Sequence, residues 1–327
     1  VRREYPDTIF LLEGLGGKLS VTDRLLAESN LDWAYSEMFQ TYDRGQFEWY
    51  LPGAITRAEK FGTLVHFAET HDNNRLANGG EVYARLRVQL AALLSWQGAW
   101  GIANGVEWYC NEKIDVHGRN DLNWGAERNI VALIAKLNSI LRTHPSFNCA
   151  CHLSMITRGG GNTLAVVRRN QDPDSTLLVL ANLDCNAGTD VEFDRTSFPE
   201  TDTVDLVTGR RVDISGRVAL APGEVLCLRG PKEPVAIDES KLIPPPSHEA
   251  TFHIVIPRDV TRDVVVPEGQ WVEVSAPSHF RMRLTDPSTG ATVRVYRSND
   301  HRVVFDSPHY YGDGTHCRVL YLDVTVY

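Results

Sequence analysis

The first half of the chain alternates short, mostly apolar segments with longer amphipathic ones. Four segments have the length of strands: 8–12, 31–35, 63–68 and 98–105. Continuous rather than alternating apolarity indicates strands that are buried on both faces, as in a parallel sheet. Four longer segments are expected as helices: 23–29, 46–60, 81–96 and 127–143. We expect a break or turn near Pro52, because proline cannot donate to the helical hydrogen-bond ladder.

These elements make four consecutive strand–helix units within residues 1–143. Repeated units of this kind predict a parallel sheet with outer helices, and four of them correspond to half of a (β/α)8 barrel. From Leu153 the pattern changes to strand-length runs separated by turn residues, which predicts an antiparallel β-sandwich. We therefore divide the chain into four parts: a half barrel at 1–146, a β-sandwich at 147–230, a stiff Pro-rich linker at 231–247 and an additional all-β domain at 248–327.

Composition excludes several classes of protein. The chain has 327 residues and a formal net charge of −9, which disfavours nucleic-acid and anionic-membrane partners. No apolar run is long enough for a transmembrane helix, and the first residues do not form a signal peptide. The 6 cysteines are scattered without a CxxC pair, which suits a reducing cytoplasm and gives no zinc site. The absence of an initiator Met leads us to expect a piece of a longer chain.

Two polar sequences follow strand-length segments. Glu13 ends the first and precedes the glycine-rich sequence Gly14-Leu15-Gly16-Gly17, which lacks the full fingerprint of a phosphate loop. The third runs into Phe67–Arg75, whose residues from Glu69 on are all polar or charged. Loops at the carboxyl ends of parallel strands point at ligands, so both sequences are candidate sites. The alternative for the second is a solvated turn that caps the next helix.

These features resemble the α-amylase superfamily, glycoside hydrolase family thirteen. The resemblance rests on the strand that ends at Glu13, on His71-Asp72 after the third strand, and on the β-sandwich that follows the last helix. It covers about residues 1–230, and Thr70 departs from the Asn that the family commonly has there. It implies that the four strands are strands 5–8 of the (β/α)8 barrel.

The resemblance also implies roles for individual residues. Glu13 would be the general acid/base, with its pKa raised by burial and by neighbouring carboxylates. Asp72 would bind sugar hydroxyls and stabilise the oxocarbenium-like transition state, with His71 on the same sugar. Arg75 would reach the adjoining subsite. Trp33 and Tyr35 would stack on the sugar rings, although packing in the core is the alternative for each aromatic residue of that region.

A retaining glycosidase of this type also needs a nucleophilic carboxylate about 5 Å from the acid. In the family this is an Asp in a Gly-x-Arg-x-Asp pattern that precedes the acid/base. The matching string 209–213 lies in the expected β-sandwich, so we interpret it as a hairpin turn that matches by chance. We expect the nucleophile and the N-terminal half of the barrel in the parent chain or a partner chain.

The resulting hypothesis is a cytoplasmic, α-glucan-active hydrolase or glucanotransferase of glycogen or maltodextrin metabolism. Its substrate would be an α-1,4/α-1,6-glucan or maltooligosaccharide, without cofactor or metal, and this fragment alone would be inactive. The alternative is a non-catalytic carbohydrate-binding or scaffold protein that retains the barrel surface. A third reading is a different α/β enzyme in which Glu13 and Asp72 meet by another topology.

Overall fold

The structure is a computed structural model. It describes residues 8–29, 31–96, 99–118, 121–148, 151–170 and 173–232, together with seven strands between Phe252 and Val326. The chain divides into two compact units: one comprises 1–34, 56–63 and 237–327, and the other comprises 35–55 and 64–236. Among the described residues, no helix combines the length and apolarity needed to cross a bilayer.

The predicted parallel pairing is present. The four strands are β1 (Leu11–Leu12), β2 (Trp33–Ser36), β3 (Thr63–Phe67) and β4 (Trp100–Gly101), in the sheet order β1-β2-β3-β4. β1 pairs parallel with β2, and β3 pairs parallel with β4 through His66 opposite Trp100. β1 and β4 are shorter than the apolar segments that predict them. The side chains of Leu64 and Val65 are buried, as continuous apolarity requires.

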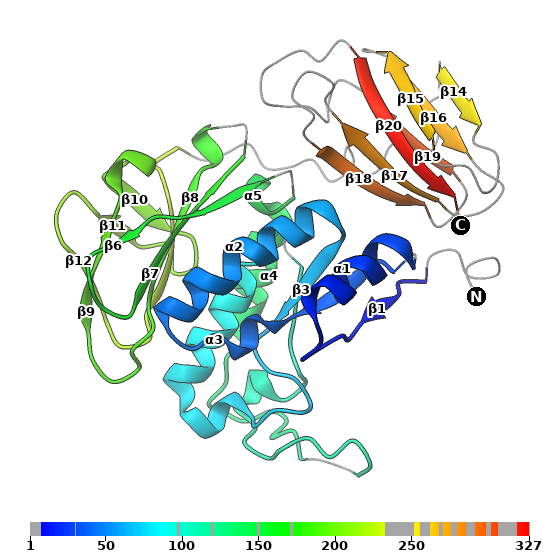
Figure 1. Cartoon of the computed structure of the whole chain (residues 1–327). Coiled ribbons are helices and arrows are strands. Elements are labelled where there is room, and N and C mark those ends of the chain that lie inside the picture. The colour runs from blue at the N-terminus through cyan, green and yellow to red at the C-terminus, as the bar shows by residue number, and fades with distance from the viewer. Residues whose placement is uncertain are drawn as a thin grey trace. The chain divides into compact units, whose positions relative to one another are not determined.

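The four expected helices are also present, with shifted ends (Figure 1). They are α1 (Leu19–Glu28), α2 (Arg44–Lys60), α3 (Glu81–Leu93) and α4 (Val131–Thr143). Short elements join them: η1 (Glu37–Gln40), η2 (Leu76–Gly79), η4 (Val106–Trp108) and α5 (Pro145–Asn148). Every residue of α3 from Leu86 to Leu93 is buried, so this helix lies within the core of its unit.

The expected break at Pro52 is wrong, because α2 continues through this residue without interruption. Proline removes one backbone donor from the ladder, yet Leu51, Ala54 and Ile55 beside it are buried. The burial of this apolar face outweighs the loss of one hydrogen bond. The local rule therefore fails because tertiary packing of the helix overrides it.

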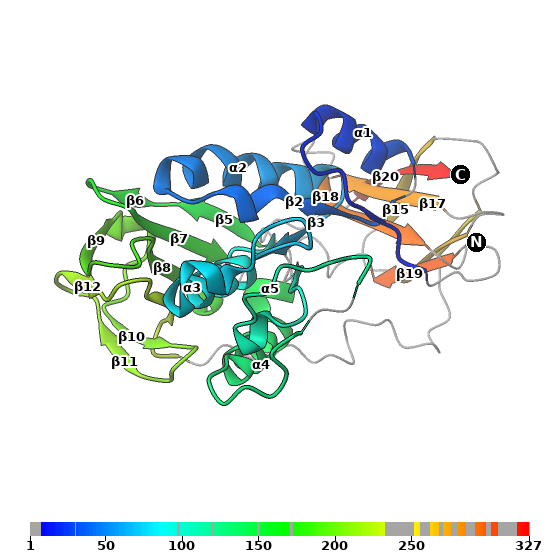
Figure 2. The same cartoon turned by 90° about the horizontal axis from the view of Figure 1, so that it is seen from below.

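The expected β-sandwich consists of two antiparallel sheets. Their strands are β5 (His152–Met155), β6 (Thr157–Arg158), β7 (Thr163–Arg169), β8 (Leu177–Asn182), β9 (Thr189–Phe193), β10 (Asp202–Asp205), β11 (Arg211–Asp213), β12 (Val218–Leu220) and β13 (Val225–Arg229). One sheet has the order β11-β10-β13-β8-β7-β5 and the other β12-β9-β6. Side chains such as Ala165, Leu180 and Phe198 form the shared core. Figure 2 shows these strands gathered beside α3.

The β-sandwich is fastened to the helices by Arg168 of β7, whose side chain is completely buried. Its guanidinium donates to the carbonyl oxygens of Leu93 and Ser95 at 3.1 and 2.8 Å. It also donates to the carbonyl oxygen of Ser146 at 2.8 Å and lies 3.9 Å from the ring centre of Phe147. These carbonyls belong to the ends of α3 and α5, so one buried cation satisfies acceptors that the helices leave open.

The C-terminal strands are β14 (Phe252–Val255), β15 (Arg262–Pro267), β16 (Trp271–Ser275), β17 (Phe280–Thr285), β18 (Thr292–Ser298), β19 (Arg302–Asp306) and β20 (Val319–Val326). They form two sheets, with the orders β14-β16-β19 and β15-β20-β17-β18. The all-β character expected of this segment is therefore present. The expected Pro-rich linker lies mostly outside the described residues.

Candidate active site

The polar sequence after β3 is organised around a buried ion pair. Nε of Arg75 lies 2.9 Å from Oε1 of Glu69, and the side chains are 0% and 2% exposed. The other carboxylate oxygen of Glu69 accepts the backbone N–H of Leu76 at 2.5 Å, at the start of η2. The guanidinium of Arg75 donates to the carbonyl oxygen of Asn104 at 2.8 Å. The pair therefore fixes both the turn after β3 and the segment after β4.

Burial raises the pKa of Glu69, because the charged carboxylate loses its hydration. The N–H of Leu76 and the charge of Arg75 oppose this shift, whereas the neighbouring carboxylate of Glu107 adds to it. Glu107 itself accepts the backbone N–H of Gly105 at 2.9 Å. The carboxylates of Glu69 and Glu107 and the guanidinium of Arg75 thus lie near one another in a poorly hydrated region beside the turn.

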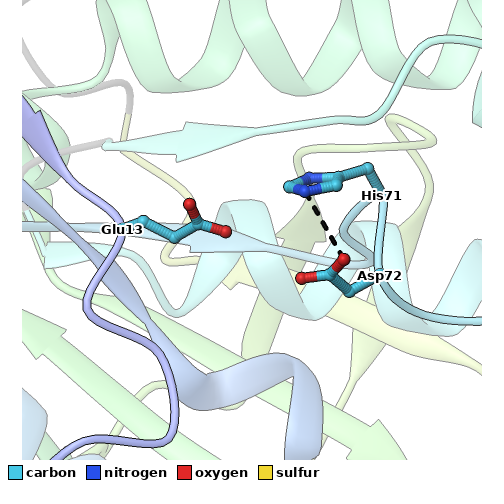
Figure 3. A group of neighbouring side chains, drawn as sticks. All are labelled: Glu13, His71 and Asp72. Atoms are coloured by element: carbon cyan, nitrogen blue, oxygen red, sulfur yellow. Dashed lines mark ion pairs between the residues drawn. The ribbon is translucent and has the colours of Figure 1, made fainter. Parts of the chain in front are cut away.

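His71 and Asp72 lie on the exposed side of the same turn (Figure 3). Nε2 of His71 is 3.5 Å from Oδ1 of Asp72, and the side chains are 40% and 69% exposed. The hydroxyl of Thr70 donates to Oδ1 of Asn73 at 2.5 Å, which closes the turn beneath them. The Asp72 carboxylate can accept hydrogen bonds from sugar hydroxyls, and an N–H of the neighbouring imidazole can donate one.

Glu13 follows β1 and is exposed. The expectation that it is buried is wrong for the described chain, because β1 stands at the end of the sheet order and has a pairing strand on one side only. The following turn needs glycine, since Gly14 and Gly16 have φ angles of +54° and +70°. Glu13 belongs to the compact unit that contains residues 1–34, and His71 and Asp72 belong to the unit that contains residues 64–236.

The two expected stacking residues differ in their surroundings. Trp33 is 36% exposed. Tyr35 is half-buried and packs on Phe67, with ring centres 4.6 Å apart and an angle of 51° between the rings. Arg75, expected to reach the adjoining subsite, has internal contacts with Glu69 and Asn104. The ion pair between Glu69 and Arg75 was not predicted. The sequence signal for it was two opposite charges on either side of a predicted turn.

His66 in β3 is also buried, but its chemistry is that of a core residue. Burial lowers its pKa to about 3, and the positive charge of Arg168 adds to the effect. The imidazole is therefore neutral near neutral pH. Its Nδ1 atom has no hydrogen-bond partner among the described residues.

The string 209–213 that resembles the family's nucleophile motif is part of a hairpin. β10 and β11 pair antiparallel, with Asp202 opposite Asp213, and Gly209 at the turn has a φ angle of +76°. This confirms the interpretation of the string as a turn of the β-sandwich.

No family model matches the chain. It is similar to an alpha-1,4-glucan:maltose-1-phosphate maltosyltransferase from Rhodospirillum rubrum, with 28% identity over 58% of this chain. The match spans 28% of the length of that relative. The activity of the whole relative therefore does not transfer to this chain without a further argument.

Solved structures show the same fold at low identity. A γ-CGTase from alkalophilic Bacillus clarkii matches with a TM-score of 0.57 and 17% identity, over 92% of this chain and 45% of that one. An α-amylase from Lactobacillus plantarum matches with a TM-score of 0.51 and 18% identity, over 70% of this chain and 57% of that one. Together with the sequence relative, these findings confirm that the chain resembles the α-amylase superfamily, glycoside hydrolase family thirteen.

Proposed function

We propose that this chain carries the acid/base and sugar-binding part of an α-glucan-active site of the retaining α-amylase type. The observation that carries the proposal is the placement of Glu13 and His71-Asp72. Glu13 follows β1 and His71-Asp72 follows β3, and both strands belong to one sheet. In this sheet β1 pairs parallel with β2, and β3 pairs parallel with β4. The carboxyl ends of parallel strands share one edge, where ligands bind in sheets of this class.

In this proposal Glu13, as the carboxylic acid, gives its proton to the glycosidic oxygen while the bond to the anomeric carbon breaks. The resulting carboxylate then takes a proton from water or from an acceptor hydroxyl that attacks the intermediate. Asp72 accepts hydrogen bonds from the sugar and stabilises the positive charge that develops on its ring. His71 binds hydroxyls of the same sugar.

We assign Arg75 a positioning role. Its guanidinium is buried against Glu69 and donates to Asn104, so it supports the turn that presents His71 and Asp72. Trp33 and Tyr35 remain proposed stacking residues, with Trp33 the more exposed of the two. No cofactor or metal takes part in the proposed steps.

The R. rubrum relative is an alpha-1,4-glucan:maltose-1-phosphate maltosyltransferase, and this favours transfer to a glucan over hydrolysis. We further propose intracellular glycogen or maltodextrin metabolism as the setting. The nucleophile is proposed to lie outside residues 1–327, so the chain alone should bind glucans without turning them over.

The proposal is tested first by binding of maltoheptaose to the full chain in a titration calorimeter. Asp72→Asn should weaken binding roughly tenfold, the scale of one charged hydrogen bond. Asp190→Asn is a matched control, because Asp190 is exposed on β9 of the β-sandwich. Equal affinity of the wild type and Asp72→Asn would contradict the sugar-binding role.

The second test measures reducing ends released from maltoheptaose or glycogen by the chain alone. We expect none. Release that is lost in Glu13→Gln, but kept in the exposed control Glu28→Gln, would show that the nucleophile is within the chain and would overturn the proposed division of the site.

The second candidate function, a non-catalytic carbohydrate-binding protein, is favoured by the exposure of Glu13. A general acid needs a shielded environment to hold its proton near neutral pH. The two candidates are distinguished by adding the proposed N-terminal half of the barrel, in a longer chain or as a partner chain. The catalytic proposal expects activity to appear, and the binding-only candidate expects none.

A further inference from the structure

Two tryptophan rings lie against each other in the segment between β4 and α4, and one of them is exposed. The rings of Trp108 and Trp124 have centres 4.3 Å apart and an angle of 35° between them. Trp124 is 76% exposed, and Trp108 is half-buried beneath it at the end of η4. We call these two residues the tryptophan pair.

The backbone beside each tryptophan is in a conformation that non-glycine residues rarely adopt. Tyr109 and Asn123 have φ angles of +52° and +53°. In the part of the chain that the structure describes, they are the two non-glycine residues with a positive φ, and each is the direct neighbour of one tryptophan. Asn adopts this region more often than most residues, whereas for Tyr109 the conformation is strained. Such strain is kept only where surrounding structure imposes it, and it concentrates at functional sites.

Hydrogen bonds supply that surrounding structure. The side-chain amide of Asn123 donates to the carbonyl oxygen of Trp108 at 2.7 Å. Sγ of Cys110 donates to the carbonyl oxygen of Asp121 at 3.0 Å, and the N–H of Ile130 donates to the carbonyl oxygen of Glu107 at 2.8 Å. These hydrogen bonds tie the two arms of the loop together, so the tryptophans are held beside each other without a ligand.

Trp49 shows what an exposed tryptophan looks like without these features. It is also 76% exposed, but it lies within α2, where its backbone is helical. The centre of its ring is 6.5 Å from that of Tyr50, its neighbour in sequence. Exposure alone therefore does not explain the tryptophan pair, whose rings meet across 16 positions because the strained loop brings them together.

We propose that the tryptophan pair is an accessory binding site for an α-glucan chain, whose sugar rings stack on the exposed indole of Trp124. The nature of the ligand rests on the proposed function. Aromatic rings offer sugars a rigid apolar face at low entropic cost. The segment 105–130 carries 5 acidic and 3 basic residues (Glu107, Glu112, Asp115, Asp121 and Glu127; Lys113, Arg119 and Arg128), which suits a neutral polyol and disfavours a polyanion.

The test uses the full chain in native gels with and without glycogen. Trp124→Ala should weaken glycogen binding roughly tenfold, the scale of one aromatic anchor. Trp49→Ala, which removes an equally exposed indole, should bind like the wild type. Trp124→Phe should bind between the wild type and Trp124→Ala, because a smaller aromatic face remains. Unchanged thermal midpoints would show that all three variants fold.

Glycogen binding that is lost equally in Trp124→Ala and Trp49→Ala, or unchanged in Trp124→Ala, overturns the accessory site. A wild type that glycogen does not retard also overturns it. A change of sedimentation mass in Trp124→Ala without a change in glycogen binding means that the pair is a contact between copies of the chain, which also overturns it.

The variant Asp72→Asn separates this inference from the proposed function. Loss of glycogen binding in Trp124→Ala but not in Asp72→Asn supports the accessory site independently of the proposed active site. Loss in Asp72→Asn alone supports the proposed function and overturns the accessory site. Maltoheptaose calorimetry on Asp72→Asn tests the proposed function by itself.

Discussion

Glu69 and Arg75 form an ion pair with 2.9 Å between Oε1 and Nε, and neither side chain is more than 2% exposed. Removing one partner leaves the other charge buried without compensation, which costs more than the pair contributes when it is intact. We therefore expect Arg75→Met to lower the free energy of unfolding by about 3–5 kcal/mol. Urea unfolding followed by circular dichroism measures this change.

The matched control for this prediction is Arg24→Met. Arg24 also pairs with a glutamate, Glu28, but at 3.9 Å and with both side chains more than half exposed. Exposed pairs of this kind contribute about 0.5 kcal/mol or less, so Arg24→Met should leave stability nearly unchanged. Equal effects of the two substitutions would contradict the structural role of the buried pair.

His66 predicts a loss of stability in acid. Its folded-state pKa of about 3 lies below the ordinary histidine value of 6.5, so the unfolded chain binds a proton that the folded chain does not. Stability is therefore complete above the unfolded pKa and is lost as the pH falls from about 6.5 towards 3, by on the order of 4 kcal/mol. His66→Leu should flatten this part of the stability–pH profile.

Denaturant melts at a series of pH values between 3 and 7 measure that profile. His117→Leu is the control, because His117 is exposed. A profile for His66→Leu that is as steep as that of the wild type would show that other groups cause the acid sensitivity.

The elements were predictable where one physical cause dominates. The run that became β3 follows directly from continuous apolarity, and His71-Asp72 stands out because polar residues follow this buried strand. The lengths of β1 and β4 were not predictable, since a residue joins a strand only when a partner strand lies beside it. The expected break at Pro52 was wrong because a rule about one residue does not include the packing of the whole helix.

The site was predictable only in part, for a similar reason. Glu69 and Arg75 are separated by a turn whose closure depends on Asn104, far along the chain, so their pairing is a tertiary property. Tyr109 and Asn123 gave no signal, because a positive φ is rare for tyrosine and is imposed by the hydrogen bonds around the tryptophan pair. The sequence therefore predicts motifs at the end of a single strand. It does not predict features that depend on contacts between distant segments.

Arg168 predicts a further loss of stability at the attachment of the β-sandwich. Its three donated hydrogen bonds hold the carbonyls of Leu93, Ser95 and Ser146, all in buried surroundings. Arg168→Met should lower the free energy of unfolding by roughly 3 kcal/mol or more, because buried acceptors lose their donors. It should also raise the pKa of His66, because the charge of Arg168 helps to lower it.

Denaturant melts between pH 3 and 7 measure both effects, because a higher folded-state pKa of His66 makes the total acid-induced loss of stability smaller. A total loss in Arg168→Met as large as in the wild type would contradict the second effect. Arg217→Met is the control for the loss of charge, because the Arg217 side chain is 90% exposed and its ion pair with Asp190 is on the surface. A similar loss of stability in both variants would contradict the fastening role of Arg168.

Gly53 predicts a gain of stability. It lies inside α2, and a Cβ atom added there meets no atom within 4 Å. Glycine in a helix interior costs about 0.5–1 kcal/mol relative to alanine, because it loses more backbone freedom on folding. Gly53→Ala should therefore raise the free energy of unfolding by about that amount, measured by urea unfolding. Gly125→Ala has equally open space around its Cβ but a φ angle of +77°, so it should destabilise the chain. A gain in both variants would mean that open space, rather than backbone conformation, decides the sign.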